Sequence, residues 1–212
     1  SPLLRWWDQR AVRRADRHLA VSANVQRRLR DIYGIHPEVL HSPVSMADGS
    51  APCAGVEPGY FLLVSRMMAY KNVDAVVRAM SELPAERLVI VGTGPLEKPI
   101  RAEAGANVEF FGRVTDEQLR WLYENSIGLV SAAYEDFGLT PLEAALCGRP
   151  SATLRSGGFL ETVIEDVTGV HFDRPEAGEI STALDKMAAR SWDSEAIRSH
   201  ADQFGIERFT AR

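Results

Sequence analysis

From residue 60 onward, short apolar runs alternate with helical patterns, and this alternation constrains the fold more than any other feature of the chain. Each run is five or six residues long and mostly apolar, which is typical of a strand that is buried on both faces. The predicted strands are residues 60–65, 88–92, 108–112, 127–131 and 150–154. The predicted helices are residues 72–83, 96–104, 116–124, 141–147 and 159–164.

One helix after every strand indicates how the strands are arranged. Parallel strands need long crossover connections, and helices that serve as crossovers cover both faces of the sheet. We therefore predict an α/β fold in which residues 60–175 form a Rossmann-like, doubly wound parallel sheet with helices on both faces.

The flanking segments have different patterns. Residues 1–45 are expected to form linking helices and short strand-like pieces, and residues 46–59, rich in Gly and Pro, are expected to form a loop. Residues 176–212 are expected to form two or three helices. The predicted packing anchors of this last segment are Trp192, Phe204 and Phe209.

The bulk composition fits a chain that folds around its own core in a reducing compartment. The chain has 212 residues, of which 45% are hydrophobic and 25% charged. Its two cysteines, Cys53 and Cys147, match neither a disulfide framework nor the spacing of metal ligands. The sequence shows no apolar run of membrane-spanning length and no signal-peptide pattern, so we expect a cytoplasmic protein. Because it opens with Ser1 and a helical pattern, we expect it to be an excised piece or the later part of a longer protein.

Charge is distributed unevenly along the chain. The first thirty residues hold eight arginines against two aspartates, a net charge of +6, whereas the whole chain carries −5. The remainder therefore carries −11, which argues against nucleic acid as the partner of the main body. The basic segment, with Trp6 and Trp7, has three explanations: packing on another domain, contact with anionic lipid at the inner face of the membrane, or a solvated face.

Polar residues and glycines gather in the loops that follow the predicted strands. Ligands of open parallel sheets bind outside the carboxyl ends of the strands. Arg66 and Lys71 follow the first strand and suit a diphosphate, because a guanidinium grips two oxygens and an ammonium at a helix start adds a second positive charge. The alternative is that both are solvated surface residues.

Glycines mark the next two loops. Gly94, in the turn Gly-Thr-Gly-Pro, and Gly112, beside Arg113, would let the backbone approach a ligand closely. Many strand-to-helix turns contain such glycines for steric reasons alone, so the pattern by itself is weak.

Residues 135–143, Glu-Asp-Phe-Gly-Leu-Thr-Pro-Leu-Glu, are the most informative stretch. Thr140 suits a helix N-cap, and Glu143 lies where the carboxylate of a capping box belongs. The amides near residues 138–140 would then face the ligand site at a helix start, where they could hold a phosphate. Glu135 has no such structural role, so a ligand hydroxyl is its better explanation.

The chain resembles the group 1 retaining glycosyltransferases, which have the two-domain GT-B architecture. Glu135 and Glu143 reproduce the paired-glutamate motif of that family. The matching motifs occur in family order: S-R-M-M-A-Y-K-N, V-G-T-G-P, F-F-G-R-V, E-D-F-G-L-T-P-L-E-A and G-G-F-L-E-T-V-I-E-D-V-T-G. The opening W-D-Q-R-A-V-R-R-A-D resembles the region that joins the two domains, so the resemblance covers residues 6–170.

The resemblance implies a role for each motif. Arg66 and Lys71 would neutralise the diphosphate as it leaves, and Glu135 would contact the sugar hydroxyls, which makes these three the predicted catalytic residues. Glu143 would bind the ribose. The other predicted donor-binding residues are Gly94, Gly112, Arg113, Phe137, Gly138, Leu139 and Thr140. The family transfers sugars with retention and without a metal, so we expect neither a metal nor a cofactor beyond the nucleotide-sugar donor.

The resemblance also implies what the chain lacks. A glycan or lipid-linked acceptor would bind to an N-terminal domain, so this chain is expected to bind the donor without efficient transfer. The opening E-D-F-G looks most like members that transfer mannose from GDP-mannose, and a UDP-sugar is the alternative donor.

Three other functions fit parts of the sequence. A noncatalytic nucleotide-sugar-binding module would keep the pocket, but the intact set of Arg66, Lys71, Glu135 and Glu143 argues against decay. An epimerase or phosphorylase of the same architecture would need other catalytic groups or a cofactor lysine. A flavodoxin-like carrier fits the alternation of strands and helices but not the paired charges.

Overall fold

The computed structural model describes residues 2–211 and contains a parallel sheet of six strands. The strands are β3 (Phe61–Val64), β4 (Leu88–Val91), β5 (Val108–Phe111), β6 (Gly128–Ser131), β7 (Ser151–Leu154) and β8 (Gly169–Phe172). Their spatial order is β5-β4-β3-β6-β7-β8, and every neighbouring pair is parallel. The five predicted strands are therefore confirmed, and β8 is an edge strand that the sequence pattern did not reveal.

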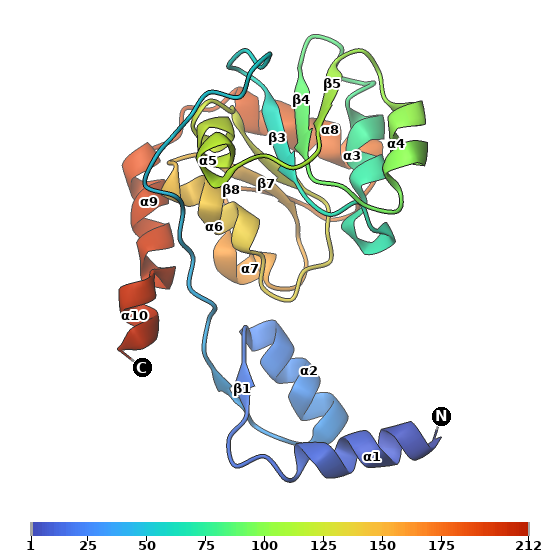
Figure 1. Ribbon diagram of the computed structural model, residues 1–212, viewed down its shortest axis with the longest axis vertical. Coiled ribbons are helices and arrows are strands. Elements are labelled where there is room, and N and C mark those ends of the chain that lie inside the picture. Colours follow the sequence, from blue (N-terminus) through green and yellow to red (C-terminus); the bar gives the residue numbers. More distant parts are fainter. Residues whose placement is uncertain (1, 212) are drawn as a thin grey trace.

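Helices cover both faces of this sheet (Figure 1). One layer contains α3 (Val73–Ala79), α4 (Glu97–Glu103) and α8 (Ala177–Ala188), and the other contains α5 (Asp116–Glu124), α6 (Leu139–Leu146) and α9 (Ser194–Ala201). The short helix α7 (Phe159–Thr162) lies against α6. The predicted doubly wound α/β fold is thus confirmed.

Alternate residues of the central strand supply the two halves of the core. Phe61 and Leu63 pack in the cluster that includes α3 and α8, whereas Leu62 packs in the cluster that includes α5 and α6. All three are at most 2% exposed. A strand buried on both faces must be apolar at every position, which is why the chain reads there as a continuous apolar run.

The N-terminal unit, residues 2–39, is built separately from the sheet domain. It contains α1 (Pro2–Val12), β1 (Leu19–Ala20), α2 (Ala23–Tyr33) and β2 (Glu38–Val39), and β1 pairs with β2 in parallel. Figure 1 shows this unit below the sheet domain, joined to it by an extended linker, residues 40–60. The chain ends in the short helices η2 (Asp202–Phe204) and α10 (Ile206–Thr210).

Several predicted details were wrong. Helix α3 ends at Ala79 instead of residue 83, because a turn follows in place of another helical turn. Strand β8 was missed since its apolar run is interrupted by His171, whose ring bonds Thr153 of β7. Trp192 and Phe204 are half-buried as packing anchors should be, but Phe209 is 37% exposed. Within residues 2–211, the helices are too short or too polar for any of them to cross a bilayer.

Candidate functional site

The strand order reverses between β3 and β6, and the loops that follow these two strands are joined there. From β3 the chain moves outward through β4 and β5, and β6 then returns to the other side of β3. Such a switch point is where open α/β sheets bind ligands. Asn72 donates a hydrogen bond to the carbonyl of Ala132 at 2.8 Å, and the amide of Tyr134 donates to the carbonyl of Tyr70 at 3.1 Å.

Two of the three predicted catalytic residues meet at this point. The Lys71 ammonium, at the end of the 3₁₀ turn η1 (Ala69–Lys71), forms an ion pair with the Glu135 carboxylate, and these side chains are only 15% and 26% exposed. The Tyr70 ring lies 5.0 Å from the ammonium. Glu135 therefore has a structural partner that the sequence did not indicate. Arg66 is exposed on the same loop and has no ion pair among residues 2–211.

Two glycines hold the loop that carries Glu135. The amide of Gly158 donates a hydrogen bond to the Glu135 carbonyl at 2.9 Å. A Cβ on Gly157 would lie 2.1 Å from that carbonyl oxygen, and one on Gly158 would lie 2.2 Å from the Phe137 Cα. The loop after β7 thus supports the Glu135 loop through contacts that only glycine permits.

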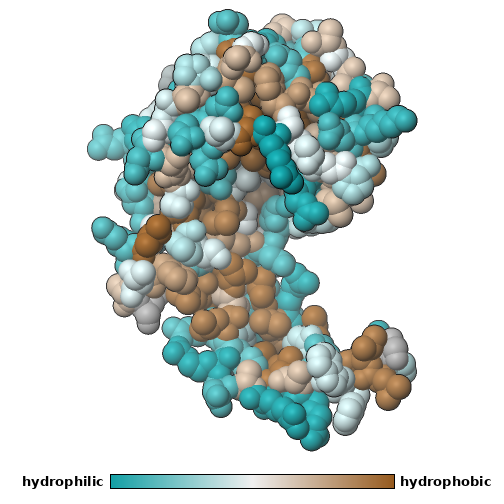
Figure 2. All heavy atoms as spheres, viewed as in Figure 1, coloured by the Kyte–Doolittle hydropathy of each residue, from teal (hydrophilic) through white to brown (hydrophobic). Residues whose placement is uncertain are grey.

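The Glu135 loop forms one wall of a hollow of about 330 Å³. The lining residues are Val21, Ser42, Glu135, Asp136, Phe137, Gly138, Leu139 and Thr140. The first two come from the N-terminal unit and the linker, so the hollow opens between the two parts of the molecule. Figure 2 shows apolar residues gathered where these parts meet. Five of the predicted site residues therefore share one cavity.

The helix that begins in this loop differs from the prediction. Helix α6 begins at Leu139, and the cap residue is Gly138, whose φ of 92° suits glycine. Thr140 lies inside the helix, so its predicted capping role is wrong, and so is the capping box of Glu143. Among the residues that the structure describes, no side chain makes an N-cap hydrogen bond to α6.

Glu143 instead points toward α5, where the Tyr123 hydroxyl donates a hydrogen bond to its carboxylate at 2.7 Å. Burial raises the pKa of Glu143, and the hydrogen bond from Tyr123 lowers it in part. Burial and the nearby Glu143 charge raise the pKa of Tyr123 well above its usual value. A buried carboxylate with one polar partner retains acceptor capacity for a ligand hydroxyl. No sequence motif indicated Tyr123, which lies 20 positions from Glu143.

The remaining predicted residues lie on the loops after β4 and β5. Gly94 has a packing role, because a Cβ there would lie 2.5 to 2.8 Å from the backbone of Met67. At Gly112 a Cβ would meet only the Thr93 methyl group, at 3.6 Å. Arg113 is exposed and forms no ion pair within the described part of the chain. Packing therefore requires a glycine at position 94 but not at position 112, and the exposed Arg113 is accessible to a ligand.

Among residues 2–211, no three His, Cys, Asp or Glu side chains gather closely enough to hold a metal ion. Cys53 and Cys147 are free thiols, and burial raises the pKa of Cys147 to about 11, which disfavours the reactive thiolate at neutral pH. The polar groups at the switch point are thus the carboxylates, the ammonium and the helix start described above.

A doubly wound sheet with a basic and acidic pair at its switch point has the architecture of a ligand-binding α/β domain. The family model of glycosyl transferases group 1 matches residues 54–204, and the chain belongs to that family. The family resemblance seen in the sequence is confirmed.

A curated relative agrees with this assignment. The D-inositol 3-phosphate glycosyltransferase of Mycobacterium tuberculosis (strain ATCC 25618 / H37Rv) is 26% identical over 239 residues, which cover 99% of this chain and 50% of the relative. The chain thus spans about half the length of the curated relatives it matches.

Solved structures share the fold, as two examples illustrate. Sucrose-phosphate synthase from Thermosynechococcus elongatus has a TM-score of 0.82 at 21% identity, covering 100% of this chain and 60% of that one. Anabaena HepE, solved in complex with UDP-glucose, has a TM-score of 0.80 at 18% identity, covering 93% and 62%. The GT-B architecture of these neighbours confirms the fold class of the sheet domain.

Proposed function

We propose that this chain is the donor-binding half of a retaining glycosyltransferase that moves a hexosyl group from a nucleotide sugar to a glycan or lipid-linked acceptor. The observation that carries the proposal is the contact between Lys71 and Glu135 across the switch point of the sheet. This contact joins Lys71, which is proposed to bind the diphosphate, to Glu135, the first glutamate of the paired-glutamate motif.

The pair suits the chemistry of sugar transfer. When the bond between the anomeric carbon and the diphosphate breaks, its electron pair leaves with the diphosphate, and a fixed ammonium nearby stabilises that charge. Lys71 is held in place by Glu135, and Arg66 is exposed and available to grip the phosphate oxygens. The acceptor hydroxyl adds on the face that the leaving group vacates, and its proton departs with the diphosphate.

The remaining contacts orient the donor. Glu143 accepts from the ribose hydroxyls, the backbone of residues 137–140 contacts sugar and phosphate, and Gly112 and Arg113 lie beside the base. The two positive side chains and the start of α6 take the place of a metal ion, so the proposed transfer is metal-independent.

The acceptor is proposed to reach the hollow from the side of the N-terminal unit. The chain by itself is then expected to bind a donor but to transfer the sugar inefficiently. Robust sugar transfer by these 212 residues alone would contradict this expectation.

The experiment that tests the function is calorimetric titration of GDP, UDP, GDP-mannose and UDP-glucose into the chain. The E-D-F-G resemblance favours GDP-mannose, whereas the structural neighbour HepE was solved with UDP-glucose, so the titration separates two donor classes. Arg66→Ala, Lys71→Ala and Glu143→Ala should each weaken binding about tenfold or more, since hydrogen bonds to charged groups contribute about 1.5–3 kcal/mol.

Arg101→Ala is the matched control, because Arg101 is an arginine of α4 that pairs with Glu97 outside the site. It should leave donor affinity unchanged. If none of the four ligands binds, or if Arg101→Ala weakens binding as much as Arg66→Ala does, the proposed donor site is wrong.

We also propose that α1 contacts anionic lipid, which would place the protein at the inner face of the cytoplasmic membrane. Leu3, Leu4, Trp6 and Trp7 are between 60% and 77% exposed, and basic residues share this helix. Apolar side chains stand out on α1 in Figure 2. Aromatic and basic residues together favour an anionic interface.

Sedimentation with vesicles of anionic lipid tests the lipid contact. The chain should sediment with them, and Trp6→Ala with Trp7→Ala should abolish sedimentation. Equal sedimentation with vesicles of neutral lipid, or none with either, would reject the contact.

A further inference from the structure

The N-terminal unit is attached to the sheet domain by a small set of polar contacts and by Val21, which packs against the apolar cluster of Val44, Phe137 and Leu142. Neither α1 nor α2 contains a buried residue, and the elements of the unit pack chiefly on one another. The first turn of α2 faces the sheet domain in Figure 1. The contacts of that turn therefore determine how the unit is oriented.

Glu161, from α7, occupies the start of α2. Its carboxylate accepts hydrogen bonds from the backbone amides of Ala23 at 3.0 Å and Asn24 at 3.2 Å. The first amides of a helix have no partner within the helix, and the helix dipole favours a negative charge at that end. A residue of the sheet domain thus caps a helix of the N-terminal unit.

Asp136 forms the second attachment, immediately after Glu135. The buried hydroxyl of Ser22, which caps α2 by accepting from the Val25 amide at 3.1 Å, donates to the Asp136 carbonyl. The Asp136 carboxylate forms an ion pair with Arg28, nearly two helical turns beyond Ser22 on α2. The loop that carries Glu135 is therefore fastened to α2 at two points.

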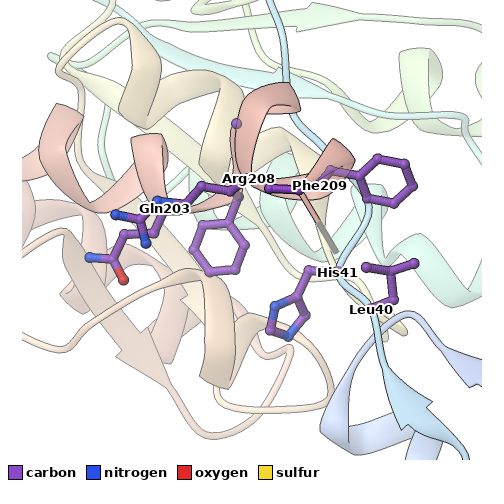
Figure 3. Close-up of a pocket in the computed structure, with 8 residues that line it drawn as sticks. Leu40, His41, Gln203, Arg208 and Phe209 are labelled. Carbon is purple, nitrogen blue, oxygen red and sulfur yellow. The ribbon is translucent and has the colours of Figure 1, made fainter.

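His41, in the linker, joins both attachments. Its Nε2 lies 3.1 Å from the Glu161 carboxylate, and its ring stacks on Phe137 with centroids 5.2 Å apart. The Phe204 ring also lies 5.2 Å from His41. Figure 3 shows His41 directed toward the side chains of the C-terminal segment that line the neighbouring cavity. The linker, the Glu135 loop and the C-terminus therefore meet at one residue.

We propose that Glu161 and Asp136 are positioning residues, which hold the N-terminal unit and the Glu135 loop in one fixed orientation. Neither carboxylate contacts Lys71 or Glu143. The two residues affect transfer through α2. They align the acceptor, which reaches the hollow from the side of the N-terminal unit, with the sugar held at Glu135. This inference rests on the proposed function for its effect on transfer, but not for its effect on orientation.

The orientation is measured directly by the distance between two spin labels. Arg27→Cys on α2 and Lys98→Cys on α4 provide exposed label sites, in a background with Cys147→Ala. The label distance should be narrowly distributed in this parent and broad after Glu161→Ala. Asp185→Asn, an exposed acidic residue of α8 whose side chain forms no bond within residues 2–211, should leave it narrow.

Kinetics separate positioning from binding. In the protein that carries this chain, turnover of the nucleotide sugar should show kcat lowered about tenfold by Glu161→Ala, with KM for the donor within twofold of the parent. Glu161→Gln keeps one carbonyl oxygen for the α2 amides and should restore part of kcat.

The pair of Arg28 and Asp136 provides a rescue test. Arg28→Asp alone places two like charges together and should broaden the distance and lower kcat, and adding Asp136→Arg should recover both.

An unchanged narrow distance after Glu161→Ala would overturn the inference, and so would equal kcat values or failure of the charge exchange to rescue. If no nucleotide binds to the parent, the proposed function fails instead. The distance measurement needs no donor, so it still tests the attachment in that case.

Discussion

The sheet domain and the N-terminal unit are stabilised in different ways. Strands β3, β4 and β6 contain residues that are fully buried between two helical layers, whereas α1 and α2 bury no residue at all. The sheet domain therefore has its own hydrophobic core, whereas the N-terminal unit is held in place mainly by hydrogen bonds and ion pairs, with Val21 as an apolar contact. Substitutions in the sheet domain should therefore have the larger effect on the free energy of unfolding. Substitutions in the N-terminal unit should mainly change how that unit is oriented.

The largest expected effect comes from a core residue of the sheet. Leu129, on β6, is 0% exposed, and Leu129→Ala should lower the free energy of unfolding by about 3 kcal/mol because it leaves a cavity. Leu4→Ala, on α1, changes a side chain that is 67% exposed and should alter stability by less than about 0.5 kcal/mol. Urea denaturation of both variants measures the difference. Similar losses in the two variants would mean that α1 is packed in solution.

The next effect comes from glycines at the edge of the site. Gly94→Ala should destabilise the sheet domain by about 2 kcal/mol, because the added Cβ would overlap the Met67 backbone. Gly112→Ala should leave stability nearly unchanged and weaken donor binding if the base lies there, since its Cβ would meet only a methyl group at 3.6 Å. Thermal unfolding and donor titration, performed on both variants, separate the two roles. A stable Gly94→Ala protein would show that the loop can move away.

The sequence predicted the sheet domain well because a strand buried on both faces must be apolar throughout. Residues 88–92 illustrate this, since β4 is observed at Leu88–Val91. Strand β8 was not predicted, because it lies at the edge of the sheet and His171 interrupts its apolar run. The start of α6 was misplaced because Gly138 caps the helix by its backbone conformation, and Thr140, with the better capping side chain, lies inside.

The site was predicted less completely, because its contacts cross long stretches of sequence. Lys71 and Glu135 were each identified as site residues, but their contact spans 64 positions and depends on β3 and β6 being neighbours. The bond from Tyr123 to Glu143 likewise depends on how α5 packs beside α6. Motif spacing selects residue types, whereas strand order and helix packing decide which of them touch.

Acidification should weaken donor binding through Glu143. Its pKa lies above the ordinary value near 4.5 because of burial, so the folded domain binds a proton there more readily than the unfolded chain does. Between 4.5 and the raised pKa, this group favours folding as the pH falls, while the ribose loses its carboxylate acceptor. Below the raised pKa, donor affinity should fall by up to about tenfold per pH unit.

Calorimetric titration at a series of pH values, from the ordinary carboxyl pKa of 4.5 upward to neutral pH, measures that dependence. Tyr123→Phe removes the hydrogen bond that lowers the Glu143 pKa, so the midpoint should move to higher pH. Glu143→Gln should remove this part of the pH dependence. A midpoint that stays in place in both variants would exclude Glu143 as the titrating group.

The smallest effect compares two helix caps, one in each part of the molecule. Ser22 caps α2 and Asp193 caps α9. Either change to Ala should cost about 1 kcal/mol locally. In α9 the buried Ile197 and Ala201 still hold the helix, so Asp193→Ala should leave its amides slow to exchange. In α2 nothing buried replaces the lost bonds, and Ser22→Ala should make the Val25 amide exchange about fivefold faster, as a loss of about 1 kcal/mol implies. Equal changes in hydrogen exchange at the two helices would mean that α2 has packing partners beyond its polar contacts, and that orientation and stability are not divided between the two parts.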